Sequence, residues 1–138
     1  MKFSYEVEGG NFAKAGNAAS NVKKVLKQLN VDPKIIKRIV VALYEGEVNV
    51  VAHAYKGMVL VDIDPSRIHI RIEDEGPGIP DIDLAMQVGY STASAMVREM
   101  GFGAGMGLPN MKRNADVIDI SSKVGEGTVV ELTTKLTS

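Results

Sequence analysis

The sequence contains no cysteine, no clear excess of either charge and no long hydrophobic run. Without cysteine, disulfides, thiolate metal sites and a thiol nucleophile are excluded, which agrees with a reducing compartment. The 16 Lys and Arg residues nearly balance 17 Asp and Glu residues, so the composition lacks the electrostatic footprint of a protein that binds nucleic acid or an anionic membrane. No stretch has the pattern of a signal peptide or reaches membrane-spanning length. We therefore expect a cytoplasmic protein without membrane contact or direct nucleic-acid binding.

What the chain has instead is an ordinary globular composition with clustered glycines. Its 138 residues, 45% of them hydrophobic, suffice for one domain with a proper core. No internal repeat or linker divides the chain, so we expect a single domain over residues 1–138. The 14 glycines gather in a few short stretches, and these stretches carry most of the functional argument.

The first half of the chain predicts a strand, two helices and a hairpin. The segment KFSYEVE alternates like a strand, and apolar residues then recur at helical spacing. Asp32 followed by Pro33 is typical of a helix start. The expected elements are a strand at 2–8, a helix from 11 to about 29, a second helix from 33 to about 55 closed by Lys56-Gly57, and hairpin strands at 58–64 and 67–74.

The second half predicts short elements around a long glycine-rich loop. We expect a short helix at 81–88, a loop from 89 to 107, a helix at 108–116, and strands at 117–123 and 129–136. Helices and strands do not strictly alternate along the chain. The expected fold class is therefore α+β, a two-layer α/β sandwich with a mixed, mostly antiparallel sheet packed on helices, rather than a doubly wound parallel sheet.

Three polar residues are spaced four apart in the second expected helix, within LYEGEVNVVAHA. Glu45, Asn49 and His53 must share one face of that helix, whereas Glu47 falls off this stripe and should point elsewhere as a bystander. The ordinary interpretation is a polar seam facing solvent. The alternative is a carboxylate and an amide that line a ligand cavity, because the rest of the helix is apolar and a carboxylate is seldom buried without a partner.

Three glycine motifs follow downstream. In IEDEGPGIP, Asp74 precedes Gly76 and Gly78, and such a carboxylate can accept a hydrogen bond from an exocyclic amine; an acidic turn is the simpler interpretation. In GFGAGMGL, glycines alternate directly before an expected helix, where backbone N–H groups and the helix dipole can cradle phosphate, although a flexible linker has the same composition. GEGTVV at 125–130 is a turn that opens the last strand with Thr128.

Taken in this order and spacing, the four motifs closely resemble those of the GHKL family of ATP-binding domains, which have the Bergerat fold. The resemblance covers nearly the whole chain, and the ordered set is far more specific than any one motif. The helical E-x-x-x-N motif is matched by Glu45 and Asn49, D-x-G-x-G by Asp74, Gly76 and Gly78, G-x-G-x-G by Gly103, Gly105 and Gly107 with Leu108 following, and G-x-G-T by Gly125, Gly127 and Thr128.

The resemblance implies a role for each motif. Asn49 would ligate Mg²⁺, Asp74 would recognise adenine, and Glu45 would be the general base. His53 would line the ATP pocket or have a structural role. The glycines of the G-x-G-x-G motif would wrap the phosphates as part of an ATP lid at about 81–108. The further residues expected to contact ATP are Gly76, Gly78, Ile79, Ser91, Thr92, Gly103, Ala104, Gly105, Met106, Gly107, Leu108 and Thr128.

Within this family the chain is most similar to stand-alone bacterial anti-sigma-factor and switch-type serine/threonine kinases. This implies a Mg²⁺·ATP-dependent kinase of a partner-switching cascade that phosphorylates a Ser or Thr of a STAS-domain protein. Gly103-Ala104 stand where sigma-binding members often have an arginine, which favours the switch-kinase branch. The alternatives are an anti-sigma factor that sequesters a sigma factor and a detached histidine-kinase ATPase domain. The exposed face of the first helix and the sheet edge could support a homodimer, but no residue specifies one.

Overall fold

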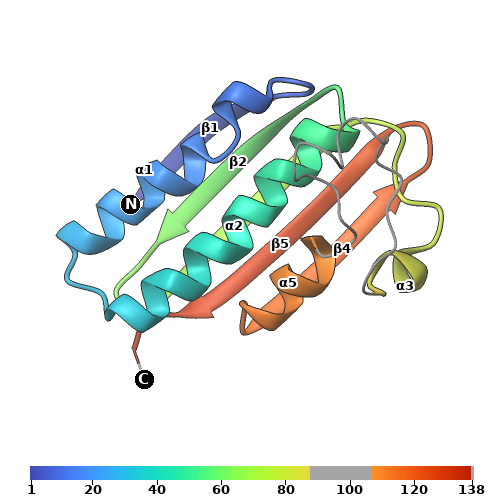
Figure 1. Cartoon of the computed structure of the whole chain (residues 1–138). Coiled ribbons are helices and arrows are strands. Elements are labelled where there is room, and N and C mark those ends of the chain that lie inside the picture. Colours follow the sequence, from blue (N-terminus) through green and yellow to red (C-terminus); the bar gives the residue numbers. More distant parts are fainter. Residues whose placement is uncertain (88–106, 138) are drawn as a thin grey trace.

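The computed structural model describes residues 1–87 and 107–137, and these form two layers, a sheet and a set of helices (Figure 1). The strand order in the sheet is β1-β2-β3-β5-β4, and all four pairings are antiparallel. The expected α+β sandwich is confirmed, with no parallel pairing among the described strands. The strands are β1 (Lys2–Glu8), β2 (Lys56–Ile63), β3 (Arg67–Glu75), β4 (Val117–Lys123) and β5 (Gly127–Lys135).

The helices cover one face of the sheet. They are the 3₁₀ turn η1 (Phe12–Lys14) and the α-helices α1 (Asn17–Gln28), α2 (Pro33–His53), α3 (Ile82–Ala85) and α5 (Gly107–Arg113). Figure 1 shows α2 between α1 and α5. The expected start of α2 is confirmed, since the Asp32 carboxylate accepts the Lys34 N–H at 2.8 Å.

Several expected boundaries are wrong. The helix expected from 11 to 29 is interrupted at Gly16, which has φ +93°, so a 3₁₀ turn and a separate helix replace it. A left-handed residue cannot continue a right-handed helix. Lys56-Gly57 were expected to close α2, but α2 ends at His53 and Lys56 already opens β2. The expected helix at 81–88 is shorter and spans Ile82–Ala85.

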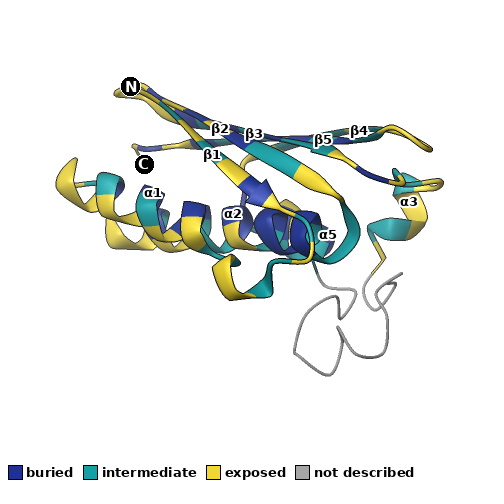
Figure 2. Ribbon diagram, turned by 90° about the horizontal axis from the view of Figure 1, so that it is seen from above, coloured by how far each residue is buried: buried dark blue, intermediate teal, exposed yellow. Residues whose placement is uncertain are grey.

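The core lies between the two layers, where strand alternation meets helical periodicity. In β2 the residues Val59, Val61 and Ile63 face the helices and are buried, while the residues between them are not. Val22 and Leu26 of α1 pack into the same cluster and are fully buried. Figure 2 shows the buried surfaces turned inward between sheet and helices. No described helix is long and apolar enough to cross a membrane.

The C-terminal end of α2 is fastened to the turn that follows β1. The Gly9 N–H donates to the Tyr55 carbonyl at 2.9 Å, and the Gly10 N–H donates to the Val51 carbonyl at 2.8 Å. The Gly10 bond satisfies the Val51 carbonyl, one of those that a helix end leaves without a partner in the helix. A side chain at Gly9 would place its Cβ 2.0 Å from the Ala54 carbonyl oxygen, so the close approach requires glycine. The end of α2 is therefore held in a fixed place relative to the sheet.

Candidate functional site

The first part of the candidate site lies where α2 meets the start of α5. The Asn110 amide of α5 donates to Glu45 Oε1 of α2 at 3.4 Å. One turn further along α2, the Asn49 amide packs against Gly107, so closely that a Cβ there would be 2.8 Å from Asn49 Oδ1. The structure thus brings together the E-x-x-x-N motif and the last glycine of the G-x-G-x-G motif, 58 positions apart in the sequence.

The Glu45 carboxylate is half-buried, and its surroundings change its acidity. Burial raises the pKa of Glu45 above the ordinary value of 4.5, because a partly desolvated carboxylate is harder to ionise. The hydrogen bond from Asn110 favours the charged form and lowers the pKa in part. A carboxylate with a raised pKa accepts a proton more readily than an exposed one, which suits a general base.

His53 is the last residue of α2 and lies one turn beyond Asn49. Burial lowers the pKa of its imidazole below the ordinary value of 6.5, so the ring is neutral at pH 7. A neutral imidazole can donate one hydrogen bond and accept another. A role for His53 in lining a nucleotide pocket stays a prediction.

The second part of the site is the carboxylate of Asp74 near the end of β3. Its Oδ1 accepts the backbone N–H of Thr128 at 3.0 Å, and this is its only hydrogen bond among the described residues. Burial raises the pKa of Asp74, and the Thr128 bond opposes that shift. One carboxylate oxygen is thereby fixed by β5, and the other remains available to a ligand.

The D-x-G-x-G and G-x-G-T motifs lie side by side and hold each other in place. The Gly76 N–H donates to the Glu126 carbonyl at 3.1 Å, and the Gly125 N–H donates to the Pro77 carbonyl at 2.9 Å. Gly127 has φ +153°, and a Cβ on it would lie 2.0 Å from the Asp74 carbonyl oxygen. This glycine is therefore required by the close approach of the two loops.

The remaining residues of these two loops fix their shape. Gly78 has φ +77°, and a Cβ on it would lie 2.5 Å from the Lys123 carbonyl oxygen. The Ile79 N–H donates to Ser122 Oγ at 2.7 Å, and that oxygen is 2.8 Å from the Thr128 hydroxyl. The hydroxyl of Thr128 thus has a partner within the protein, so its expected contact with ATP stays a prediction.

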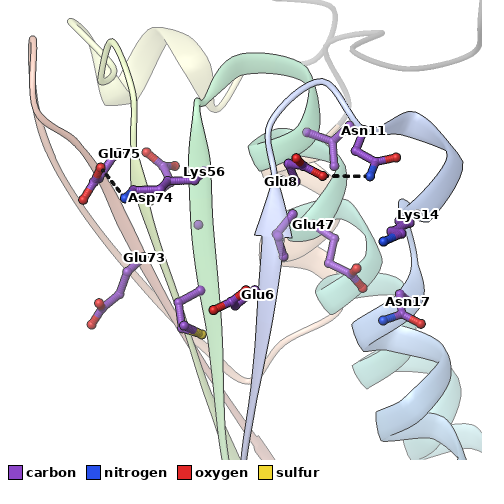
Figure 3. A pocket seen from close by; sticks show the side chains of 14 residues that line it. Glu6, Glu8, Asn11, Lys14, Asn17, Glu47, Lys56, Glu73, Asp74 and Glu75 are labelled. Atoms are coloured by element: carbon purple, nitrogen blue, oxygen red, sulfur yellow. Dashed lines mark hydrogen bonds and ion pairs between the residues drawn. The ribbon is translucent and has the colours of Figure 1, made fainter.

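A cavity of about 730 Å³ opens on the other side of α2, toward β1 (Figure 3). It reaches Asp74 but neither Glu45 nor Asn49, which face α5 instead. Figure 3 shows carboxylates and amides around it, with Asn11 hydrogen-bonded to Glu8. The described cavity is therefore not by itself the pocket that the motifs predict.

Glu47 is the residue whose role the sequence did not reveal. It does point away from the Glu45 stripe, as expected, but it is no bystander. Its side chain is only 1% exposed, and its carboxylate accepts backbone N–H groups from Gly16 at 3.2 Å, Ala18 at 3.1 Å and Ala19 at 2.6 Å. No side chain of α1 caps that helix, so Glu47 of α2 serves as its cap. No pattern in the sequence indicated this role, because the apolar spacing continues through Gly16 and does not mark a helix start there.

Replacing Glu47 by Gln is expected to lower the free energy of unfolding by about 2–4 kcal/mol. The amide keeps the shape and its oxygen can still accept, but the NH₂ group in place of the second oxygen cannot, so one or two of the N–H donors at the start of α1 lose their partner. Urea denaturation followed by circular dichroism measures the loss. The control is Glu6→Gln, which removes the same charge at an exposed position of β1 and should change stability by less than about 0.5 kcal/mol. Equal effects of the two variants would contradict the capping role.

Part of the expected site lies outside the described residues. This holds for most of the expected lid at 81–108 and for six of the residues expected to contact ATP, which are Ser91, Thr92, Gly103, Ala104, Gly105 and Met106. The end of the lid is described, and there Leu108 is buried in the core beside Gly107. In the described part of the chain, no three His, Asp or Glu side chains are grouped so that they could hold a metal.

The chain is similar to known proteins over most of its length. Residues 11–134 match the family model described as histidine kinase-like ATPase domain. The serine/threonine-protein kinase RsbT of Bacillus subtilis (strain 168) is 34% identical over 113 residues, which cover 79% of each chain. The anti-sigma F factor of Geobacillus stearothermophilus is 30% identical over 138 residues, covering 96% of this chain and 88% of that protein.

A solved structure supports the fold. The structure of the RsbU and RsbW domains of a Mycobacterium tuberculosis protein superposes with a TM-score of 0.67. The match covers 99% of this chain and 32% of that one at 17% sequence identity, so it supports the architecture alone.

Proposed function

The chain belongs to the family of histidine kinase-like ATPase domains, and on that premise we propose that it is a Mg²⁺·ATP-dependent serine/threonine protein kinase. Its substrate is a serine or threonine of a STAS-domain protein in a bacterial partner-switching cascade. We place the kinase and its substrate in the cytoplasm. The observation that carries the proposal is the placement of Glu45 and Asn49 on one face of α2, against the start of α5. A base and a metal ligand one helical turn apart suit phosphoryl transfer to a hydroxyl.

The residues at the site fit a nucleotide. Asp74 has one oxygen fixed by the Thr128 N–H, which leaves the other to accept the exocyclic amine of adenine. Asn49 Oδ1 would serve as the protein ligand of Mg²⁺, with phosphate and water oxygens completing its shell, because Mg²⁺ is usually held by few protein groups. The glycines that end at Gly107 would give their backbone N–H groups to phosphate oxygens. Bound Mg²⁺·ATP supplies the phosphoryl group.

Glu45 carries the chemistry that the protein itself contributes. Its carboxylate would accept the proton of the attacking hydroxyl, and its raised pKa makes it a better acceptor. Asn110 holds Oε1 through a hydrogen bond and thereby sets the direction of the carboxylate. The other carboxylate oxygen would then face the incoming hydroxyl.

The direct test is incubation with radiolabelled ATP, Mg²⁺ and a candidate STAS-domain protein. The proposal expects acid-stable phosphoserine or phosphothreonine on that protein. Acid-labile label would instead indicate transfer to histidine and a detached histidine-kinase domain. A stable complex with a sigma factor, with no phosphotransfer to any STAS protein, would indicate an anti-sigma factor that acts by sequestration.

The relatives support both the kinase and the anti-sigma alternative, since both types of protein are about equally similar to this chain. The sequence of the lid distinguishes the kinase from the anti-sigma factor better than these identities do. Gly103-Ala104 replace an arginine that sigma-binding members often have, and this favours the kinase. Homodimer formation stays a prediction that gel filtration with light scattering can test.

A further inference from the structure

The net charge of −1 conceals a strong separation of charge along the chain. The 33 residues from Phe12 to Tyr44 contain seven Lys or Arg residues and a single acid, Asp32. The whole chain has 16 basic and 17 acidic residues, so the other 105 residues hold nine basic and sixteen acidic ones. The first segment therefore has a formal charge of +6, while the rest has −7.

The fold collects most of this positive charge on one surface. Helical geometry turns the lysines of α1 away from its buried residues, Val22 and Leu26, and toward solvent. The same holds for the lysines of α2, which lie opposite Ile36 and Ile39. Figure 2 shows the outer sides of both helices as exposed. We call this surface the lysine face; its five lysines, all exposed, are Lys23, Lys24, Lys27, Lys34 and Lys37.

The lysine face is not neutralised by the protein. None of the ion pairs found within residues 1–87 and 107–137 includes any of these lysines, whereas Arg38, Arg67 and Arg71 all have carboxylate partners. The single acid of the segment, Asp32, is engaged as the cap of α2. Uncompensated like charge opposes folding, so its concentration on one surface points to recognition of a negatively charged partner.

The position of the face connects it to the candidate base. Lys34, Lys37 and Tyr44 recur at helical spacing on the outer side of α2, and Tyr44 is 38% exposed. Glu45 follows directly, turned toward α5. Glu45 lies eight positions after Lys37, which corresponds to about 12 Å along the helix axis. A folded protein that rests on the lysine face therefore has one edge at Glu45.

We propose that the lysine face is the docking surface for an acidic surface of the protein substrate. The proposal rests on the kinase function and adds the charge of the partner to it. A folded acidic protein fits better than nucleic acid, because the face is the outer side of a helix pair bordered by the candidate base. Docking there would bring an acceptor hydroxyl to Glu45 without any lysine taking part in the chemistry.

The first test compares two double variants with the same net charge of −5. Lys24→Glu with Lys37→Glu changes the lysine face, and Lys2→Glu with Lys135→Glu changes exposed lysines of the sheet. The probe is a fluorescent 20-residue poly-L-glutamate, followed by anisotropy at low and high salt. The lysine-face variant is expected to lose at least about tenfold in affinity and the control less than about twofold, because steering depends on where the charge lies. Equal loss in both variants would overturn the proposal.

Two further probes test the class of partner. A 20-base-pair DNA duplex and vesicles of phosphatidylglycerol are measured against the same proteins in the same buffer. Weaker binding of both probes than of poly-L-glutamate supports an acidic protein. Tighter binding of DNA or vesicles through the lysine face would assign the surface to that partner and overturn the proposal.

The second test uses phosphotransfer and separates the docking surface from the kinase function. With a STAS-domain protein as substrate, the lysine-face variant should raise KM for that protein about tenfold, with kcat and the Kd for ATP within about twofold of wild type. An unchanged KM would overturn the docking proposal. If wild type itself transfers no phosphate, the kinase function fails, and the poly-L-glutamate measurements still decide whether the lysine face binds acidic chains.

Discussion

Glu45→Gln is expected to lower the rate of phosphotransfer to a STAS-domain protein by about 10²–10⁴-fold, the usual contribution of a positioned general base. The amide keeps the size of the side chain and can still meet Asn110, but it cannot accept a proton. Affinity for Mg²⁺·ATP should stay within about threefold of wild type, because Asp74 and Asn49 are unchanged. Single-turnover phosphorylation and nucleotide titration measure the two quantities separately.

The control for this variant is Glu73→Gln, which removes a carboxylate on the opposite face of the sheet. That variant should keep the wild-type rate within about twofold. A Glu45→Gln protein with the wild-type rate would show that the hydroxyl is deprotonated by another group or by solvent, and the proposed base would be wrong.

The raised pKa of Glu45 predicts how the rate of phosphotransfer depends on pH. The base must be ionised to act, and burial raises its pKa above 4.5, so the rate should fall as the pH is lowered through a value above 4.5. The Asn110 hydrogen bond stabilises the ionised form. Asn110→Leu should therefore move the acidic limb of the kcat profile to higher pH, whereas Glu73→Gln should leave it in place.

Gly127→Ala is expected to weaken ATP binding by about 10–100-fold and to lower the free energy of unfolding by about 2–3 kcal/mol. The added Cβ would lie 2.0 Å from the Asp74 carbonyl oxygen and 3.1 Å from its carboxylate, so β3 and β5 must separate where the adenine recognition group is held. The Thr128 N–H bond that fixes Asp74 would then be lost or lengthened. Isothermal titration calorimetry and urea denaturation measure the two effects.

Gly125→Ala is the matched control in the same turn. Gly125 has φ +83°, but a Cβ on it would meet no atom within 4 Å. The substitution should cost about 1–2 kcal/mol for the left-handed backbone and leave ATP affinity within about threefold. If Gly127→Ala bound ATP like wild type, the placement of Asp74 by β5 would have no part in nucleotide recognition.

Much of the architecture could be predicted because its causes are local. Alternation over 2–8 and 117–123 predicts β1 and β4 with the bounds that the structure has. Asp32 and Pro33 predict the first turn of α2, since capping involves only neighbouring residues. The break at Gly16 was missed, because apolar spacing continues through it and conformational freedom at one glycine leaves no periodic signal.

The sequence by itself determined the order of the elements, the four motifs and their spacing, and the alignment of Glu45 with Asn49 on one helix face, because each follows from local geometry or from the chain order. Only the tertiary structure decided that Gly107 packs against Asn49, that Gly127 must be glycine because Asp74 lies against it, and that Glu47 caps α1. These relations join residues 28 to 58 positions apart. They arise from the packing of α1, α2, α5 and the sheet, and spacing along the chain carries no record of that packing.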